Sequence, residues 1–328
     1  MTVKIGFIGV GGIASVHLQN VSQIEEAQIV AVCDIDQNRA EEVGRKYEAK
    51  AYTDHQDMMD HEKLDAVYVC IPPFAHGDVE LAVIERNLPM LVEKPLSIER
   101  EPAETIVKAV SQQQLMTGVG YNWRYSEASN WAKEILENHK PGMAQGYWLG
   151  GMPMVPWWRK MDGSGGQMVE QTTHIVDLSR YLLGEVVQVY AAYAQREMQD
   201  VVEGTTVPDV GTMVLKFESG TIATISNTCL LNQGYTVGLD ILARETILEV
   251  RNGHLTERRN KETIERHNSL NPYLEEDKAF IKAVQTGDRT LIRSNYEDAY
   301  RTHLVTVAAN ESAKTGQPID LQSLYPVL

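Results

Sequence analysis

Short apolar runs rich in β-branched residues alternate with amphipathic segments over the first third of the chain. The runs predict strands at 3–8, 28–33, 65–71, 90–92 and 116–119. Helices fit between them: Asp36 can cap a helix over 37–47, and Pro102 stands in the first turn of a helix that ends near Gln114. Strands separated by helices indicate a parallel sheet. We therefore expect an α/β fold whose first domain, residues 1–121, is a doubly wound parallel sheet.

After about Tyr121 the pattern changes to longer runs of strand character. These runs lie at 186–195, 211–217, 221–231 and 235–243. Tight turns are indicated at 218–220 and 251–253 by their glycines, and strands joined by tight turns form antiparallel sheets. Helices are expected at about 126–138, 273–285 and 296–314. We expect a second α/β domain at 122–328 with an open, mainly antiparallel sheet, and late helices that can pack back on the first domain.

Composition excludes several classes of protein. With 328 residues, 43% of them hydrophobic, the chain is long and apolar enough for two folded domains. Its net charge of −15 disfavours nucleic acid and anionic membranes as partners. No apolar run reaches the ~18 residues of a membrane span, and residues 1–12 lack a secretory signal pattern, so we expect a cytoplasmic protein. Cys33, Cys70 and Cys229 are widely spaced, which favours buried thiols over disulfides or a zinc site.

A glycine-rich motif, Gly9-Val10-Gly11-Gly12-Ile13-Ala14, follows the first predicted strand and opens a predicted helix. In that context Gly9 permits a tight turn, Gly11 lets the backbone approach a pyrophosphate, and Ala14 allows close helix packing. The helix N-terminus then faces the negative charge. The alternative, that the glycines serve only a turn, is disfavoured because strand, helix and a following acidic residue are all present.

That acidic residue is Asp34, 20 positions after Ala14, where a carboxylate can hydrogen-bond a ribose hydroxyl. A 2′-phosphate would meet like charge there, so NAD is preferred as the cofactor. NADP stays an alternative, because Arg39 could offset the repulsion.

Two further loops follow predicted strands at the same carboxyl edge, outside which open parallel sheets bind ligands. In the first, Ile71, Pro72 and Pro73 form a rigid segment beside the cofactor, and His76 either contacts the cofactor or caps the next helix. The second is Glu93-Lys94-Pro95, in which Glu93 and Lys94 are candidate cofactor contacts. Lys94 is expected within reach of the reacting end of the cofactor, although a solvated lysine would have the same local sequence.

The segment after Gly165-Gly166 reads as one helix that runs to Leu183. Glu170, His174 and Asp177 would then share one face of it. A carboxylate beside an imidazole suits general acid–base chemistry on a hydroxyl, with Lys94 as a partner. A metal could also be held by such a pair, but no third ligand at suitable spacing is visible, so we expect none. A solvent-facing polar helix is the other alternative.

Together these segments resemble the Gfo/Idh/MocA family, which includes glucose-fructose oxidoreductase and inositol 2-dehydrogenase. The matching residues are Gly9, Gly11, Ala14, Asp34, Pro72-Pro73 with His76, Glu93-Lys94-Pro95, 120–125, Trp158-Arg159, Gly165-Gly166, His174 and Asp177. The resemblance implies a Rossmann domain, a second α/β domain that often forms dimer or tetramer contacts, and NAD(P)-dependent redox chemistry on sugars or cyclitols. It also implies that Lys94 is the catalytic lysine and that His174 exchanges a proton with the substrate.

This chain departs from the family pattern at two positions. Glu170 stands where the family commonly has Asp, and Thr172 stands where it has a small residue. A longer carboxylate beside a bulkier neighbour reshapes the pocket, so no particular family substrate is expected.

All five tryptophans lie between positions 123 and 158. This clustering suggests an aromatic wall for a sugar ring, with Trp123 and Trp158 the first candidates to touch substrate and Arg124 and Arg159 available for its polar groups. The alternative is that most of the tryptophans fill the core of the second domain.

The leading hypothesis is an oxidoreductase that moves a hydride between NAD and a secondary alcohol of a sugar, sugar acid or cyclitol. His174 would take the hydroxyl proton with help from Lys94, and Glu170 would orient substrate or histidine. Two alternatives remain: a glycoside hydrolase that uses NAD as a transient redox catalyst, and a non-catalytic nucleotide sensor. We expect a homodimer or homotetramer and a small-molecule sugar or polyol as partners.

Overall fold

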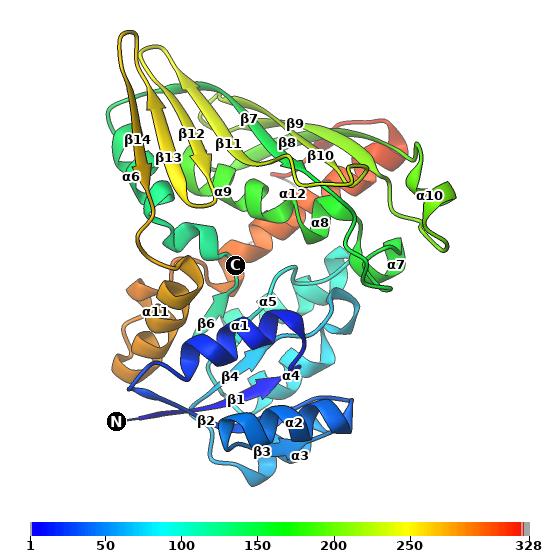
Figure 1. Cartoon of the computed structure of the whole chain (residues 1–328), viewed down its shortest axis with the longest axis vertical. Helices are drawn as coiled ribbons and strands as arrows, with labels where there is room; N and C mark the ends of the chain where they lie inside the picture. Colours follow the sequence, from blue (N-terminus) through cyan, green and yellow to red (C-terminus); the bar gives the residue numbers. More distant parts are fainter. Residues whose placement is uncertain (1, 323, 325–328) are drawn as a thin grey trace.

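The computed structural model describes residues 2–322 and 324, which form two sheets with helices packed on and between them (Figure 1). The first sheet has six parallel strands in the order β3-β2-β1-β4-β5-β6. Their bounds are β1 Val3–Ile8, β2 Ala27–Cys33, β3 Lys50–Tyr52, β4 Ala66–Val69, β5 Met90–Val92 and β6 Thr117–Val119. This is the doubly wound Rossmann order, which confirms the predicted fold class. Only β3 had no sequence signal, because it has three residues and none is buried.

Five helices connect these strands. They are α1 Gly12–Val21, α2 Gln37–Tyr47, α3 His55–His61, α4 Asp78–Glu85 and α5 Arg100–Gln113, with the short η1 Pro73–Ala75 before α4. Asp36 caps α2 as predicted, since its side chain accepts a hydrogen bond from the Arg39 backbone N–H. Asp54 does the same for α3 through the N–H groups of Gln56 and Asp57. These caps fix where each helix leaves the carboxyl edge of the sheet.

The second sheet has nine strands in the order β14-β13-β12-β11-β7-β10-β9-β8-β15. The bounds are β7 Pro141–Leu149, β8 Val186–Ala194, β9 Val210–Phe217, β10 Ile222–Thr228, β11 Thr236–Ala243, β12 Ile247–Arg251, β13 His254–Arg258, β14 Thr263–His267 and β15 Ile319–Asp320. All neighbours are antiparallel except β7 and β10. The sheet is therefore mixed but mainly antiparallel, as expected.

The helices that contact this sheet lie on one of its faces (Figure 1). They are α6 Glu127–Leu136, α8 Gln167–Glu170, α9 Thr173–Leu183 and α12 Tyr296–Thr315. The remaining helical segments are η2 Asn122–Tyr125, α7 Met161–Ser164, α10 Met198–Val201, α11 Pro272–Thr286 and η3 Arg289–Leu291. Within the described residues, no helix combines the length and apolar character that a membrane crossing needs.

Two late helices belong to both halves of the structure. Phe280 and Ile281 of α11 are buried in the core between the first sheet and α1. On α12, Tyr300 and Leu304 lie in the core beside α5, whereas Val305 and Ala308 enter the core of the nine-stranded sheet. Helix α12 therefore joins the two sheets through apolar contacts on both sides.

The predicted single helix from 167 to 183 is wrong. Two helices occupy this stretch, α8 and α9, and the chain turns at Gln171 and Thr172. In a continuous helix the His174 N–H would bond to the Glu170 carbonyl, but here it bonds to the Gln171 carbonyl at 3.3 Å. The Glu170 carbonyl is left open to other donors.

Candidate functional site

The glycine-rich loop between β1 and α1 contains glycines with different constraints. A Cβ on Gly9, at φ +81°, would lie 2.4 Å from the Cys70 carbonyl oxygen, so packing against the end of β4 requires this glycine. A Cβ on Gly11 would meet only Arg39 Nη1, at 3.8 Å, and one on Gly12 would meet no described atom within 4 Å. The space above Gly11 and Gly12 is therefore open.

Helix α1 begins at this open space. Its N-cap residue is Gly11, and the described chain offers no side-chain cap and no acidic residue in the first turn. The first N–H groups of the helix are then available to an anion, with the helix dipole in favour. Ala14 of this turn is fully buried, which allows the helix to lie close to the sheet. The loop fits the pyrophosphate of a dinucleotide.

Asp34 follows β2 and lies beside the same loop. Its Oδ2 accepts a hydrogen bond from the Val10 N–H at 3.0 Å, and its Oδ1 accepts one from the Asp36 N–H at 2.9 Å. Arg39 Nη1 is 3.7 Å from Asp34 Oδ2 and also lies over Gly11. The carboxylate is thus held at the loop with its charge partly balanced by one guanidinium.

The loop after β4 closes the other side of the nucleotide loop. The Ile71 side chain lies 3.0 Å from where a Cβ on Gly9 would stand. Pro72 and Pro73 lead into η1. His76 is buried and bonds through Nδ1 to Glu80, whose other oxygen accepts the Gly77 N–H. His76 was expected either to contact the cofactor or to cap the next helix, and its bond to Glu80 at the start of α4 matches the second role.

Glu93 lies in the interior, 2% exposed, although we predicted it as a cofactor contact. Its Oε1 bonds to His17 Nε2 at 2.9 Å, and its Oε2 accepts the Lys94 N–H at 3.0 Å. The other nitrogen of His17 bonds to Asp277 of α11 at 2.7 Å. Burial alone would lower the pKa of His17, but the Asp277 and Glu93 carboxylates raise it well above its ordinary value. The buried His17 thus holds Glu93 in place, and Glu93 in turn bonds to the backbone N–H of Lys94.

The Lys94 side chain reaches across from the first sheet to α8. Its Nζ lies 3.0 Å from the Glu170 carbonyl oxygen and 3.2 Å from Glu170 Oε1. The other carboxylate oxygen of Glu170 accepts a hydrogen bond from Trp158 Nε1. Both charged side chains are largely buried, with 13% and 14% exposed. The ammonium is therefore held by one residue, through both its backbone and its side chain.

His174 lies in the first turn of α9 and is 5% exposed. Its ring stacks on Trp148 with centroids 5.8 Å apart and makes a T-shaped contact with Tyr121, with centroids 6.1 Å apart. Its Nδ1 has no hydrogen-bond partner among the described residues. Burial and, to a lesser extent, the charge of Lys94 hold the pKa of His174 well below its ordinary value. The imidazole is therefore neutral near pH 7 and able to accept a proton.

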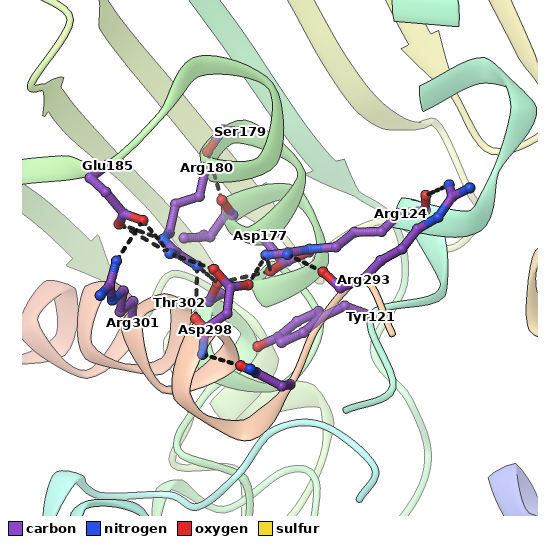
Figure 2. Close-up of polar contacts among 12 residues, drawn as sticks. Tyr121, Arg124, Asp177, Ser179, Arg180, Glu185, Arg293, Asp298, Arg301 and Thr302 are labelled. Carbon is purple, nitrogen blue, oxygen red and sulfur yellow. Dashed lines mark hydrogen bonds and ion pairs between the residues drawn. The ribbon is translucent and has the colours of Figure 1, made fainter. Parts of the chain in front are cut away.

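Glu170, His174 and Asp177 do not form the single helical face that the sequence predicted, because Glu170 lies on α8 whereas His174 and Asp177 lie on α9. The contacts of Asp177 lead away from Glu170. Figure 2 shows Asp177 facing Arg124, whose Nε and Nη2 bond to its two oxygens at 2.8 and 2.6 Å. Arg124 also pairs with Asp298 of α12 at 2.5 Å and donates to the Arg293 carbonyl. This guanidinium, predicted to be available to substrate, is instead taken up by a buried network. The network fixes η2, α9 and α12 to one another.

The structure also shows the surroundings of the aromatic and arginine residues predicted to contact substrate. Trp123 is 6% exposed and packs in the core of the nine-stranded sheet. Trp158 is 2% exposed and offers only its indole N–H, to Glu170. Arg159 is half-buried, and its carbonyl accepts the N–H groups of Thr206 and Val207.

Sequence reasoning missed two residues that contact His174, namely Trp148 and Tyr121. Both were within reach of a signal, because Tyr121 belongs to the segment that resembles the family and Trp148 to the tryptophan cluster. The Trp148 contact depends on the packing of α9 against β7, and Tyr121 is held beside α9 by the hydrogen bond between its hydroxyl and Thr173. No local pattern shows either arrangement. The residues that meet are thus Lys94, Glu170 and His174, with Trp148, Tyr121 and Trp158 around them.

Comparison with known proteins places this geometry in context. Residues 3–121 match a family model described as "Oxidoreductase family, NAD-binding Rossmann fold", and residues 139–249 match the GFO/IDH/MocA C-terminal domain. A myo-inositol 2-dehydrogenase of Thermotoga maritima is 26% identical over 336 residues, covering 98% of this chain and 99% of that protein.

Solved structures share the same fold. An oxidoreductase from Agrobacterium radiobacter in complex with NAD+, L-tartaric acid and magnesium superposes with a TM-score of 0.87 at 18% identity, over 99% of this chain and 100% of that one. Levoglucosan dehydrogenase in complex with NADH and L-sorbose gives a TM-score of 0.87 at 19% identity, over 100% of both chains. The two family models together span most of the chain, which therefore belongs to the Gfo/Idh/MocA family of NAD(P)-dependent oxidoreductases.

Proposed function

We propose that the protein catalyses reversible hydride transfer between a nicotinamide cofactor and a secondary alcohol of a sugar, sugar acid or cyclitol. The observation that supports this most directly is the contact between Lys94, at the carboxyl edge of the first sheet, and Glu170, beside the helix that carries His174. It brings a proton-accepting imidazole and an ammonium to the edge where the nucleotide loop ends. The names of relatives that act on inositol and levoglucosan support the substrate class.

Each residue has a role in this proposal. His174 takes the proton of the substrate hydroxyl as the C–H hydride leaves and the carbonyl forms, because its depressed pKa keeps it neutral. Lys94 binds the reacting oxygen and stabilises its developing negative charge. Glu170 orients Lys94, to which it is bonded, rather than the histidine. Trp148 and Tyr121 hold the imidazole in place and exclude water from it.

The cofactor site comprises the open loop and its neighbours. We assign the pyrophosphate to the N–H groups near Gly11, Gly12 and Ile13, with Gly9 and Ala14 shaping the loop. When bound, the nicotinamide supplies hydride chemistry that no side chain can provide. Asp34 favours NAD over NADP, whose 2′-phosphate it would repel. Ile71, Pro72, Pro73 and His76 form the adjoining wall.

Purified protein should be tested with NAD and NADP against a panel of cyclitols, aldoses, sugar acids and aryl glycosides. The proposal expects stoichiometric NADH formation with one sugar class and a weaker signal with NADP. Aglycone release without net NADH would instead identify a redox-assisted glycoside hydrolase. Cofactor binding without turnover on any substrate would favour a nucleotide sensor.

Replacing Lys94 by Ala tests the assignment at the residue that joins the two sheets. Turnover should fall by at least about 100-fold, because the ammonium that stabilises the reacting oxygen is lost. NAD affinity, measured by fluorescence titration, should change less than about twofold. Lys108→Ala, which removes an exposed lysine paired with Glu104, is the matched control. Undiminished turnover in Lys94→Ala would refute the role.

In this proposal residues 1–121 bind the cofactor and 122–328 bind substrate. We further propose that two or four copies associate through the face of the nine-stranded sheet opposite its helices. Apolar side chains at matched positions support this, since Met143 lies directly opposite Ile222, and Tyr190 opposite Val214. These side chains are 37–44% exposed.

A further inference from the structure

Three side chains that commonly bind metal ions meet at the β14 edge of the nine-stranded sheet. His254 lies on β13, and Glu265 and His267 lie on β14, the outermost strand (Figure 1). One donor atom from each residue lies within 4.8 Å of the donors of the other two. His267 Nε2 is 3.1 Å from Glu265 Oε1, and the imidazole centroids are 5.7 Å apart. None of these residues takes part in the proposed oxidoreductase site.

The register of the two strands brings the side chains together. His254 lies directly opposite His267. The next pair, Gly253 and Asn268, is hydrogen-bonded, because the Asn268 N–H donates to the Gly253 carbonyl at 2.7 Å. His254 and His267 therefore form a non-hydrogen-bonded pair, the kind whose side chains approach most closely. Glu265 precedes His267 by two residues and so projects from the same face.

Cations on the neighbouring positions are already paired. Arg251 lies opposite His254 on β12, but its guanidinium bonds to Asp240 at 2.7 Å. Arg258, on the same strand as His254, pairs with Glu249. Arg258 also interacts electrostatically with Glu265, but no guanidinium forms an ion pair with Glu265 among the described residues, and the Glu265 carboxylate stays in contact with His267. The side chains of Glu265 and His267 are 52% and 71% exposed, so an ion can reach them from solution.

We propose that His254, Glu265 and His267 bind a divalent transition-metal ion of the Zn²⁺ type. Two imidazole nitrogens and one carboxylate are an established donor set for such ions, whereas Mg²⁺ and Ca²⁺ prefer oxygen ligands. Zinc–ligand distances of about 2.0–2.2 Å place tetrahedral donors about 3.4 Å apart. Rotation of the exposed Glu265 and His267 side chains toward the half-buried His254 can close the donor atoms from 4.8 Å to this separation. Water occupies the fourth position, and the ion fastens β14 to β13.

The test is Zn²⁺ binding to the full chain, freed of any affinity tag, by calorimetry. One saturable equivalent is expected, with affinity reduced at least tenfold in His254→Gln and in His267→Gln and reduced less in Glu265→Gln. Mg²⁺ should give no saturable heat. His61→Gln on α3 and Glu262→Gln beside β14 are matched exposed controls and should bind Zn²⁺ as the unaltered protein does.

A second readout separates the metal site from folding. Zn²⁺ should raise the melting temperature of the unaltered protein and leave that of the His254→Gln/His267→Gln double variant unchanged. Circular dichroism without metal should show all variants folded, because Glu265 and His267 are exposed and His254 is only half-buried. Absence of saturable Zn²⁺ binding, or binding that survives both histidine substitutions, overturns the proposal.

Discussion

At the scale of single residues, the three glycines of the nucleotide loop separate folding from binding. Gly9 is required by the protein itself, because any Cβ there collides with the Cys70 carbonyl. Gly11 and Gly12 have no such constraint from the described chain. The three glycines form one motif in the sequence, but packing within the protein requires only Gly9, whereas Gly11 and Gly12 leave space for a ligand.

Valine substitutions at two of these positions should therefore affect different properties, stability at Gly9 and NAD binding at Gly11. Gly9→Val should lower the free energy of unfolding by several kcal/mol, since its backbone sits at positive φ and its side chain clashes. Gly11→Val should leave the melting temperature within about 2 °C and weaken NAD binding at least tenfold. Thermal unfolding and NAD titration of both variants measure this. Equal loss of stability in the two would contradict the distinction.

The protonation of His174 is set by its surroundings and can be measured directly. NMR titration should give His174 a pKa below about 6.5, because burial disfavours the imidazolium. Lys94→Met should raise that pKa, since it removes a nearby positive charge, while Lys108→Met should not. Alcohol oxidation should accordingly persist below pH 6.5 and fail only when His174 becomes protonated. A normal or raised pKa in the unaltered protein would rule out the neutral base.

At the scale of elements, local signals predicted five of the six strands of the first sheet and the Asp36 cap of α2. They failed where an element depends on distant atoms. Strand β7 contains Pro141 and two glycines, a weak strand signal, yet Gly146 is needed there because a Cβ would lie 2.7 Å from Ile175 of α9. The break between α8 and α9 is stabilised by Lys94, which bonds to the Glu170 carbonyl from 76 residues away. Lys94, Glu170 and His174 were candidates from the sequence, but the hydrogen bonds between Lys94 and Glu170 were not predicted.

The His17 cluster couples α1, α11 and the Lys94 loop, and its charge should appear in stability. The pKa of His17 is raised in the folded state, so its charge adds to the free energy of unfolding. This added stability is fully present below the unfolded-state pKa near 6.5. It is lost as the pH rises toward and through the folded-state pKa. His17→Gln should cost roughly 3–5 kcal/mol at pH 6. Urea unfolding should show that the difference in unfolding free energy between the unaltered protein and His17→Gln becomes smaller above pH 6.5.

His61→Gln, at an exposed site on α3, serves as the control for that series and should change stability by less than about 0.5 kcal/mol. A gap between His17→Gln and the unaltered protein that does not narrow with pH would mean that His17 is not charged.

At the scale of the whole molecule, the uncovered face of the nine-stranded sheet should set the assembly state. Ile222→Glu places a charge among the exposed apolar side chains of this face. It should shift the protein toward monomers, which light scattering after gel filtration would measure. Leu270→Glu, at another exposed apolar side chain outside the sheet, should not. An unaltered protein that is monomeric at all concentrations would refute association through this face.

Helices α11 and α12 follow every strand of the first sheet in the sequence, which has a consequence for how that sheet is completed during synthesis. Phe280 of α11 and Tyr300 of α12 fill cores on the first sheet, whose own strands all precede residue 120. When those strands have just emerged from the ribosome, the nascent chain still lacks Phe280 and Tyr300, whose side chains fill these cores. The first sheet can therefore reach its final packing only after α11 and α12 have also emerged, and both follow strands β7 to β14 of the second sheet.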